Sequence, residues 1–100
     1  MEFEWDENKR NDVLKKRGVD ILYAALIFEN YVLTWRDERQ DYGEKRLISL
    51  GLVDGDPYIV VHTERNGVTR LITAWKGGQN DFGKYQASIA SRAAGDDETG

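Results

Sequence analysis

The sequence predicts an α+β domain in which an antiparallel sheet of four to five strands carries two N-terminal helices on one face and a short C-terminal helix. The spacing of apolar residues is helical up to Asn30 and becomes strand-like after it. Turn signals, "DGDP" and "RNG", then separate apolar runs at the spacing of hairpin-linked strands. Because 100 residues can bury one core, we expect a single domain over residues 1–92 and a disordered acidic tail over residues 93–100.

The two N-terminal helices are predicted from their capping residues. Asp6 has the chemistry of an N-cap for a helix over residues 7–17, and Gly18 that of a left-handed stop. Asp20 is a second N-cap candidate, and apolar residues at helical spacing follow it over residues 21–28. Both helices should cover one face of the sheet, because a single sheet cannot bury its own faces.

Runs of β-branched and aromatic residues predict the strands. The expected strands are 3–5, 31–36, 46–53, 58–64 and 68–75, and the expected C-terminal helix covers residues 80–94.

The composition excludes several kinds of site. The chain has no cysteine and a single histidine, which excludes disulfides and cysteine catalysis and argues against a transition-metal site. We therefore expect no metal and no cofactor. The charged start "MEFEWDENKR" lacks the apolar core of a signal peptide, and no apolar run reaches the length of a membrane span. These features fit a cytoplasmic protein without membrane attachment.

The charge of the folded part is close to neutral. The net charge is -4, but three of the 18 acidic residues lie in the tail, so residues 1–92 hold 14 basic and 15 acidic side chains. This balance disfavours nucleic-acid binding by bulk charge. A local basic groove remains compatible with it.

Four basic residues lie at strand ends or turns of neighbouring strands, namely Arg46, Arg65, Arg70 and Lys76. Strand pairing would bring some of them together, and such a cluster could hold a phosphate and stabilise a pentavalent transition state. The alternative is ordinary solvated charge that pairs across strands with Glu64 or Asp41.

His62 is two residues from Glu64, so both side chains should lie on one face of a strand. A histidine beside a carboxylate can act as a general base with its orienting group. The alternative is a half-buried histidine with a satisfied hydrogen bond.

Alternation along residues 68–75 assigns two sets of side chains to opposite faces. Trp75 falls on the side of the sheet that we expect to be open, where it could form part of a contact surface. The alternative is that Trp75 is a core residue that closes the end of the sheet against the C-terminal helix. We expect Val68, Arg70, Ile72 and Ala74 to face the helices, and Thr69, Leu71, Thr73 and Trp75 to face the open side.

Four blocks resemble the BrnT family of toxins from bacterial type II toxin–antitoxin pairs: "FEWDENKR", "LKKRGVD", "DYGEKRLISLG" and "VVHTERNGVTRLITA". The resemblance runs in order from about Phe3 to Tyr85. It implies a RelE-like fold and a metal-independent ribonuclease that cleaves RNA and inhibits translation, in which the 2′-OH attacks the adjacent phosphate. It also implies a BrnA-type antitoxin as partner, with RNA as substrate and a heterotetramer or a homodimer as the assembly.

The resemblance also implies which residues act. The matching catalytic positions are Arg46, Glu64, Arg65, Arg70 and Lys76, and the candidate contacts to RNA or partner are His62, Trp75, Lys84 and Tyr85.

Three departures from the family pattern leave two functions open. Arg17 stands where the pattern has histidine, Trp75 where it has arginine, and "GGQNDFGKYQ" where it has a basic run. One function is an active ribonuclease toxin with an altered site. The other is a binding protein of the same fold that is catalytically weakened or inactive and only pairs with an antitoxin.

Overall fold

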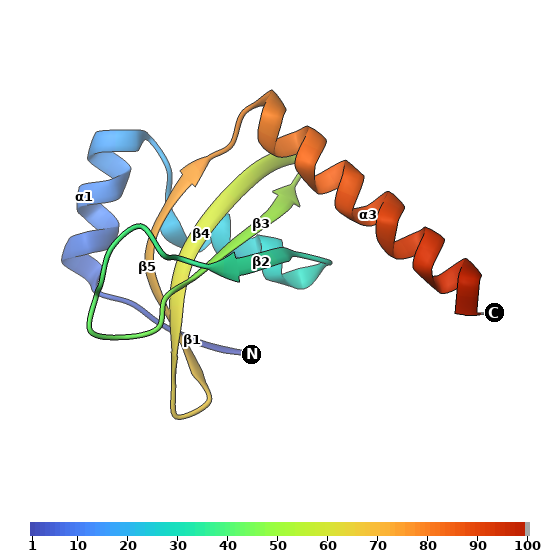
Figure 1. Cartoon of the computed structure of the whole chain (residues 1–100). Coiled ribbons are helices and arrows are strands. Elements are labelled where there is room, and N and C mark those ends of the chain that lie inside the picture. Colours follow the sequence, from blue (N-terminus) through green and yellow to red (C-terminus); the bar gives the residue numbers. More distant parts are fainter. Residues whose placement is uncertain (100) are drawn as a thin grey trace.

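A computed structural model describes the backbone of residues 1–99 and the side chains of residues 1–93. It confirms the α+β class, with one five-stranded sheet in the order β1-β5-β4-β3-β2 and helices packed against it (Figure 1). The elements are β1 (Glu2–Glu4), α1 (Glu7–Arg17), α2 (Ile21–Ala24), η1 (Ala25–Glu29), β2 (Leu33–Arg36), β3 (Leu47–Val53), β4 (Asp56–Arg65), β5 (Val68–Lys76) and α3 (Gln79–Thr99).

The sheet is mixed rather than wholly antiparallel. Strands β2 to β5 form the expected antiparallel meander. Strand β1 joins its edge parallel to β5, with Glu2 opposite Val68 and Glu4 opposite Arg70. Tight turns fix the directions of β3, β4 and β5, and a loop over residues 37–46 joins β2 to β3, but no short connection joins β1 to β5, so the sequence did not predict this direction.

The predicted caps start and stop the first helix. The carboxylate of Asp6 accepts from the backbone N–H groups of Asn8 and Lys9, and Gly18 ends α1 with a φ of 67°. Asp20 caps α2 by accepting from Leu22 N at 2.9 Å. The expected second helix over residues 21–28 is one turn of α-helix followed by the 3-10 helix η1.

Each face of the sheet has its own apolar cluster. We call the side covered by α1, α2 and η1 the α1 face, and the opposite side, against which α3 packs, the α3 face. The largest buried members on the α1 face are Ile21, Ile27, Val60 and Leu71. The α3 face buries Ile48, Leu50, Ile59, Val61 and Tyr85, and the half-buried Trp35, Ile72 and Trp75 pack against them.

A β-bulge reverses the side-chain alternation in the middle of β5. His62 pairs with Leu71 and Val61 with Thr73, which leaves Ile72 as the extra residue. Leu71 therefore packs on the α1 face and Ile72 on the α3 face. The prediction from alternation was wrong for these two residues and for Arg70, which alternates with Leu71 and turns to the α3 face instead of toward the helices, because it assumed a regular strand.

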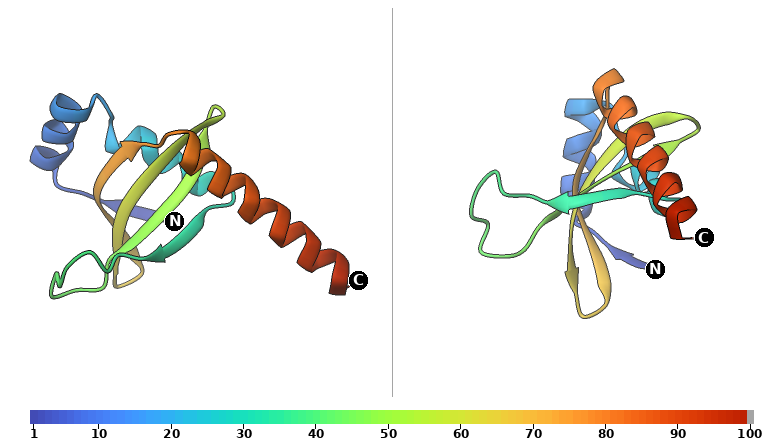
Figure 2. Two further views of the ribbon diagram at one scale, coloured as in Figure 1. Left: turned by 45° about the horizontal axis from the view of Figure 1, so that its top comes forward. Right: turned by 45° about the vertical axis from the view of Figure 1, so that its right-hand side comes forward.

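Helix α3 is longer than the predicted segment 80–94. Its first turns pack on the sheet, where Tyr85 donates to the carbonyl of Tyr31 at 2.8 Å and the hydroxyls of Tyr31 and Ser88 lie 2.6 Å apart. The rest extends away from the sheet (Figures 1 and 2), which makes the molecule 47 Å long but 29 Å and 26 Å in its other dimensions. The tail that we expect to be disordered covers residues 93–100. The side chains of residues 94–100 are outside the described part of the chain, and the disorder of the tail stays a prediction.

We predict that Gly51→Ala lowers the free energy of unfolding by about 1–3 kcal/mol, the usual cost of overpacking. Gly51 of β3 lies against η1, and a Cβ there would meet the Cβ of Ile27 at 2.7 Å and Cγ1 of Val32 at 3.1 Å. Urea unfolding measures the effect. Gly78→Ala is the matched control, because a Cβ at Gly78 has no neighbour within 4 Å. Equal midpoints for the two variants would contradict the prediction.

Candidate functional site

Three of the predicted catalytic residues meet at the end of the sheet where β4 turns into β5. Arg46 precedes β3, Arg65 ends β4 and Arg70 lies in β5, and all three line one pocket of about 400 Å³. Arg70 is opposite Thr63 in the ladder, and because it alternates with the neighbouring Leu71, its side chain turns to the α3 face. We call this the arginine pocket. Its charged lining residues are Asp6, Lys9, Glu44, Arg46, Arg65 and Arg70, four basic and two acidic side chains.

Glu44 holds two of the arginines in place. Its carboxylate accepts from Arg65 Nη2 at 3.0 Å and from Arg46 Nε at 3.3 Å. The hydrogen bond from Arg65, followed by that from Arg46, lowers the pKa of Glu44, so this carboxylate is ionised at neutral pH. The guanidinium of Arg46 also lies 4.0 Å from the ring centroid of Tyr42. Glu44 and Tyr42 were not predicted as site residues, although both belong to the block "DYGEKRLISLG" that resembles the family.

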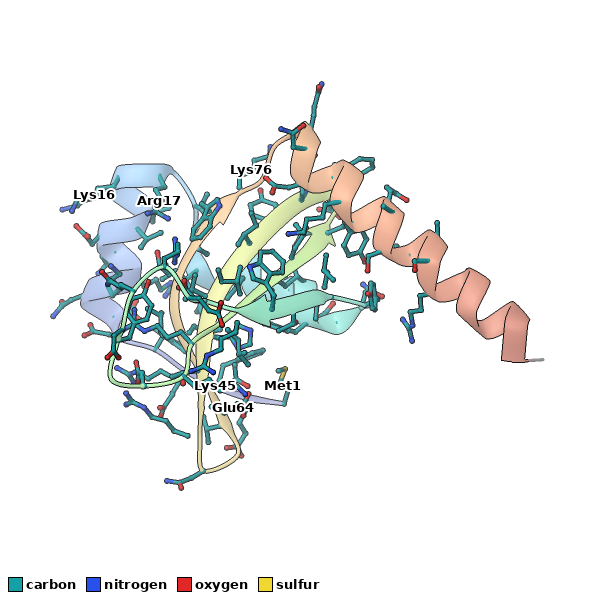
Figure 3. All side chains as sticks on the ribbon, viewed as in Figure 1. Met1, Lys16, Arg17, Lys45, Glu64 and Lys76 are labelled. Carbon is teal, nitrogen blue, oxygen red and sulfur yellow. The ribbon has the colours of Figure 1, made fainter. Side chains whose placement is uncertain are left out.

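Neither Glu64 nor Lys76 lines the arginine pocket. The carboxylate of Glu64 accepts from Thr69 Oγ1 at 2.8 Å, and Glu64 lines a neighbouring pocket that shares Glu44 and Arg65 with the arginine pocket. Lys76 Nζ is 3.6 Å from Asp56 Oδ2, and it lies at the opposite end of β5, about 20 Å from Arg70 at the usual rise of a strand. Figure 3 shows the labelled Glu64 and Lys76 at opposite ends of the sheet.

His62 is buried on the α1 face. Its ring Nε2 is 2.7 Å from the hydroxyl of Ser49, and its ring meets that of Phe28 edge-on at 5.1 Å. Burial lowers the pKa of His62, and the charge of Glu64 opposes this only in part. This is the arrangement of a buried histidine with a hydrogen bond to a core hydroxyl. His62 therefore has no open path to a ligand, and we leave it out of the proposed site.

Trp75 lies on the α3 face at the far end of β5 from the arginine pocket. Its half-buried indole packs with the apolar cluster of that face. Two guanidiniums lie against the ring, with Cζ of Arg17 5.3 Å and Cζ of Arg39 5.6 Å from its centroid. Trp75 thus combines the two alternatives expected from the sequence, core and contact surface. Part of its side chain packs in the apolar cluster, and the remainder lies beneath two arginines.

The two predicted contact residues of α3 differ in exposure. Lys84 is exposed, and its Nζ lies 3.8 Å from the ring centroid of Trp35. Tyr85 is 4 % exposed and belongs to the core of the α3 face. Lys84 can therefore reach a ligand on this face, whereas Tyr85 holds α3 in place.

Two further features bear on the kind of site. Within the described residues, no three His, Cys, Asp or Glu side chains are grouped so that they could hold a metal ion. None of the helices in that part of the chain combines the length and apolar character needed to cross a bilayer.

The fold and the site together define a small α+β protein with an arginine-lined pocket at one end of its sheet. A model of the family described as ribonuclease toxin, BrnT, of type II toxin-antitoxin system matches residues 5–80. This match covers most of the chain, so the chain belongs to that family, as the resemblance in sequence indicated. No curated protein matches the chain.

We predict that stability falls as the pH drops below about 6.5, the ordinary pKa of histidine. Because burial lowers the pKa of His62 in the fold, the unfolded chain binds a proton at a pH where the folded chain does not. The contribution of the neutral ring is complete above that pH and is lost as the pH falls toward the folded-state pKa. Urea midpoints at about pH 7.5 and about pH 5.5 measure the loss.

His62→Gln is the control for this pH dependence, since His62 is the one histidine of the chain. The carboxylates with lowered pKa, such as Asp37 and Glu44, stabilise the fold above their unfolded pKa near 4 and lose this effect only at lower pH. An unchanged difference between the two midpoints in His62→Gln would contradict the prediction.

Proposed function

We propose that this toxin is a metal-independent endoribonuclease whose arginine pocket binds the scissile phosphate of RNA. The observation that carries the proposal is the convergence of Arg46 before β3, Arg65 at the end of β4 and Arg70 in β5 on one pocket. Guanidinium groups match phosphate geometry and keep their charge at every physiological pH. A toxin of this kind would act in the cytoplasm, where it would inhibit translation by cutting RNA.

The pocket supports a transesterification within the RNA backbone. The 2′-OH oxygen attacks the adjacent phosphorus, the bond from phosphorus to the 5′ oxygen breaks, and a 2′,3′-cyclic phosphate and a 5′-OH result. The arginines neutralise the charge that develops on the pentavalent transition state.

The 2′-OH must lose a proton in this step, and the departing 5′ oxygen must gain one. Of the two carboxylates in the pocket, Glu44 is the one that contacts two of the proposed phosphate-binding arginines, Arg46 and Arg65, whereas Asp6 caps α1, so we propose Glu44 as the proton acceptor. The 5′ oxygen takes its proton from solvent, because a guanidinium does not give one up. Glu64 and Lys76 remain catalytic candidates on the resemblance alone.

We predict that Arg65→Ala lowers the rate of RNA cleavage by about 10²–10³, the usual loss for one transition-state donor. A chelator such as EDTA should leave cleavage unchanged. Primer extension on an mRNA incubated with the purified protein measures both effects. Arg36→Ala is the matched control, because Arg36 is an exposed arginine of β2 that does not line the arginine pocket. Equal cleavage by the two variants would contradict the role of the pocket.

Family membership implies an antitoxin partner, and we propose that a BrnA-type protein neutralises this chain in a heterotetramer. Aromatic and arginine side chains on the α3 face offer anchors of the kind that interfaces favour, among them Trp75 and Arg39. Gel filtration with the product of the neighbouring gene should show one stable complex. Separate migration at micromolar concentration would contradict it.

A second candidate function is a catalytically weakened protein of the same family that only pairs with the antitoxin. The observation that favours it is Trp75, a neutral side chain where the resemblance implies an arginine. A stable complex with the antitoxin, together with no cleavage and no growth arrest when the toxin is induced alone, would support this alternative.

A further inference from the structure

We infer that Trp75, together with Arg17 and Arg39, forms a base-stacking subsite for single-stranded RNA at the end of the α3 face that lies opposite the arginine pocket. The inference rests on the proposed function, because it takes the strand bound in the pocket as the ligand of both sites.

The bulge in β5 puts the two sites on one face. Arg70 and Trp75 are five residues apart, and in a regular strand such residues point to opposite faces. The extra residue Ile72 changes the alternation, so Trp75 lies on the α3 face like Arg70. The two side chains are about 15 Å apart along the strand. The loop between β2 and β3 reaches both sites, because its Arg39 lies over Trp75 and its Glu44 and Arg46 line the arginine pocket. An RNA strand held in the arginine pocket can therefore reach the indole along this loop on the same face.

The two arginines against Trp75 differ in how firmly they are held. Arg39 donates to both carboxylate oxygens of Asp37, at 2.8 Å and 2.7 Å, and the side chain of Asp37 is fully buried. Its position is thus fixed, and the hydrogen bond from Arg39 is the main reason that the pKa of Asp37 is lowered. Arg39 is a preset cation beside the ring.

Arg17 is held more weakly. It is exposed at the basic end of α1, and its hydrogen bond in the described part of the chain is a 3.3 Å contact to the carbonyl of Ala74. Figure 3 shows Arg17 at the same end of the molecule as Lys16 and Lys76. A nucleobase can displace Arg17 from the indole, and the released guanidinium is then free to bind the neighbouring phosphate.

Neither of the other tryptophans offers the same arrangement. Trp35 lies beneath Lys84 of α3 at 3.8 Å, where α3 itself occupies the surface. Trp5 lies on the α1 face, and its indole N–H donates to Glu7 at 2.7 Å, so a carboxylate rather than a cation stands beside it. Aromatic rings flanked by basic side chains are the usual platform for unpaired bases, and a base inside a duplex could not reach the ring.

The test uses the full chain and a fluorescent single-stranded RNA with 2′-O-methyl groups, which prevent cleavage, in an anisotropy titration. Trp75→Leu keeps apolar bulk but lacks a stacking face, and it should weaken binding roughly 5- to 150-fold. Trp75→Phe should retain most of the affinity. Arg17→Ala should reduce the slope of log affinity against log salt by about one phosphate contact. Trp5→Leu is the matched control and should bind like the unaltered chain.

The outcomes separate this inference from the proposed function. If the unaltered chain cleaves RNA but Trp75→Leu binds as tightly as Trp75→Phe, the subsite is overturned and the proposed function stands. If the unaltered chain binds no RNA, both are overturned. If Trp75→Leu weakens the antitoxin complex and leaves RNA binding unchanged, the surface serves the protein partner, and the subsite is overturned.

Discussion

The hydrogen-bonded ladder of β3, β4 and β5 is the constraint on which both cores and the arginine pocket depend. The central strand β4 is buried on both sides, with Val60 in the cluster of the α1 face and Val61 in that of the α3 face. Because the same ladder aligns the ends of three strands, it also brings Arg46, Arg65 and Arg70 to one place. Packing and site geometry therefore share a single register, and a shift of that register would disturb both.

Local chemistry made much of the fold predictable. The caps at Asp6 and Asp20 and the turn at Asn66 and Gly67 depend on side chains within a few residues, and the structure has them where the sequence placed them. The parallel pairing of β1 and the bulge in β5 depend on partners far away in the chain. No local pattern encodes such pairings, so alternation alone put Leu71 on the wrong face.

The candidate site shows the same difference between features that depend on nearby residues and features that depend on partners far away in the chain. Neighbouring strands joined by a short hairpin must bring Arg65 and Arg70 close, and the sequence was sufficient to expect it. The sequence was not sufficient to predict which face of the sheet each side chain occupies. Glu64 and His62 alternate away from the pocket, and Glu44 enters it from a loop that follows no period. Residues in a loop are placed by their partners, here by Arg46 and Arg65.

The long helix α3 allows local opening of its outer part to occur separately from global unfolding of the sheet and its two cores. Tyr85 and Ser88 tie its first turns to the sheet, and Arg92, whose guanidinium lies 4.7 Å from the ring centroid of Tyr31, is its last described contact with the body. In the last turn whose side chains are described, residues 89–93 are exposed, so helix formation there depends on backbone hydrogen bonds and residue propensity more than on burial. Amide hydrogens in this turn can exchange through local opening that leaves both cores closed, at little cost to the global stability of the protein.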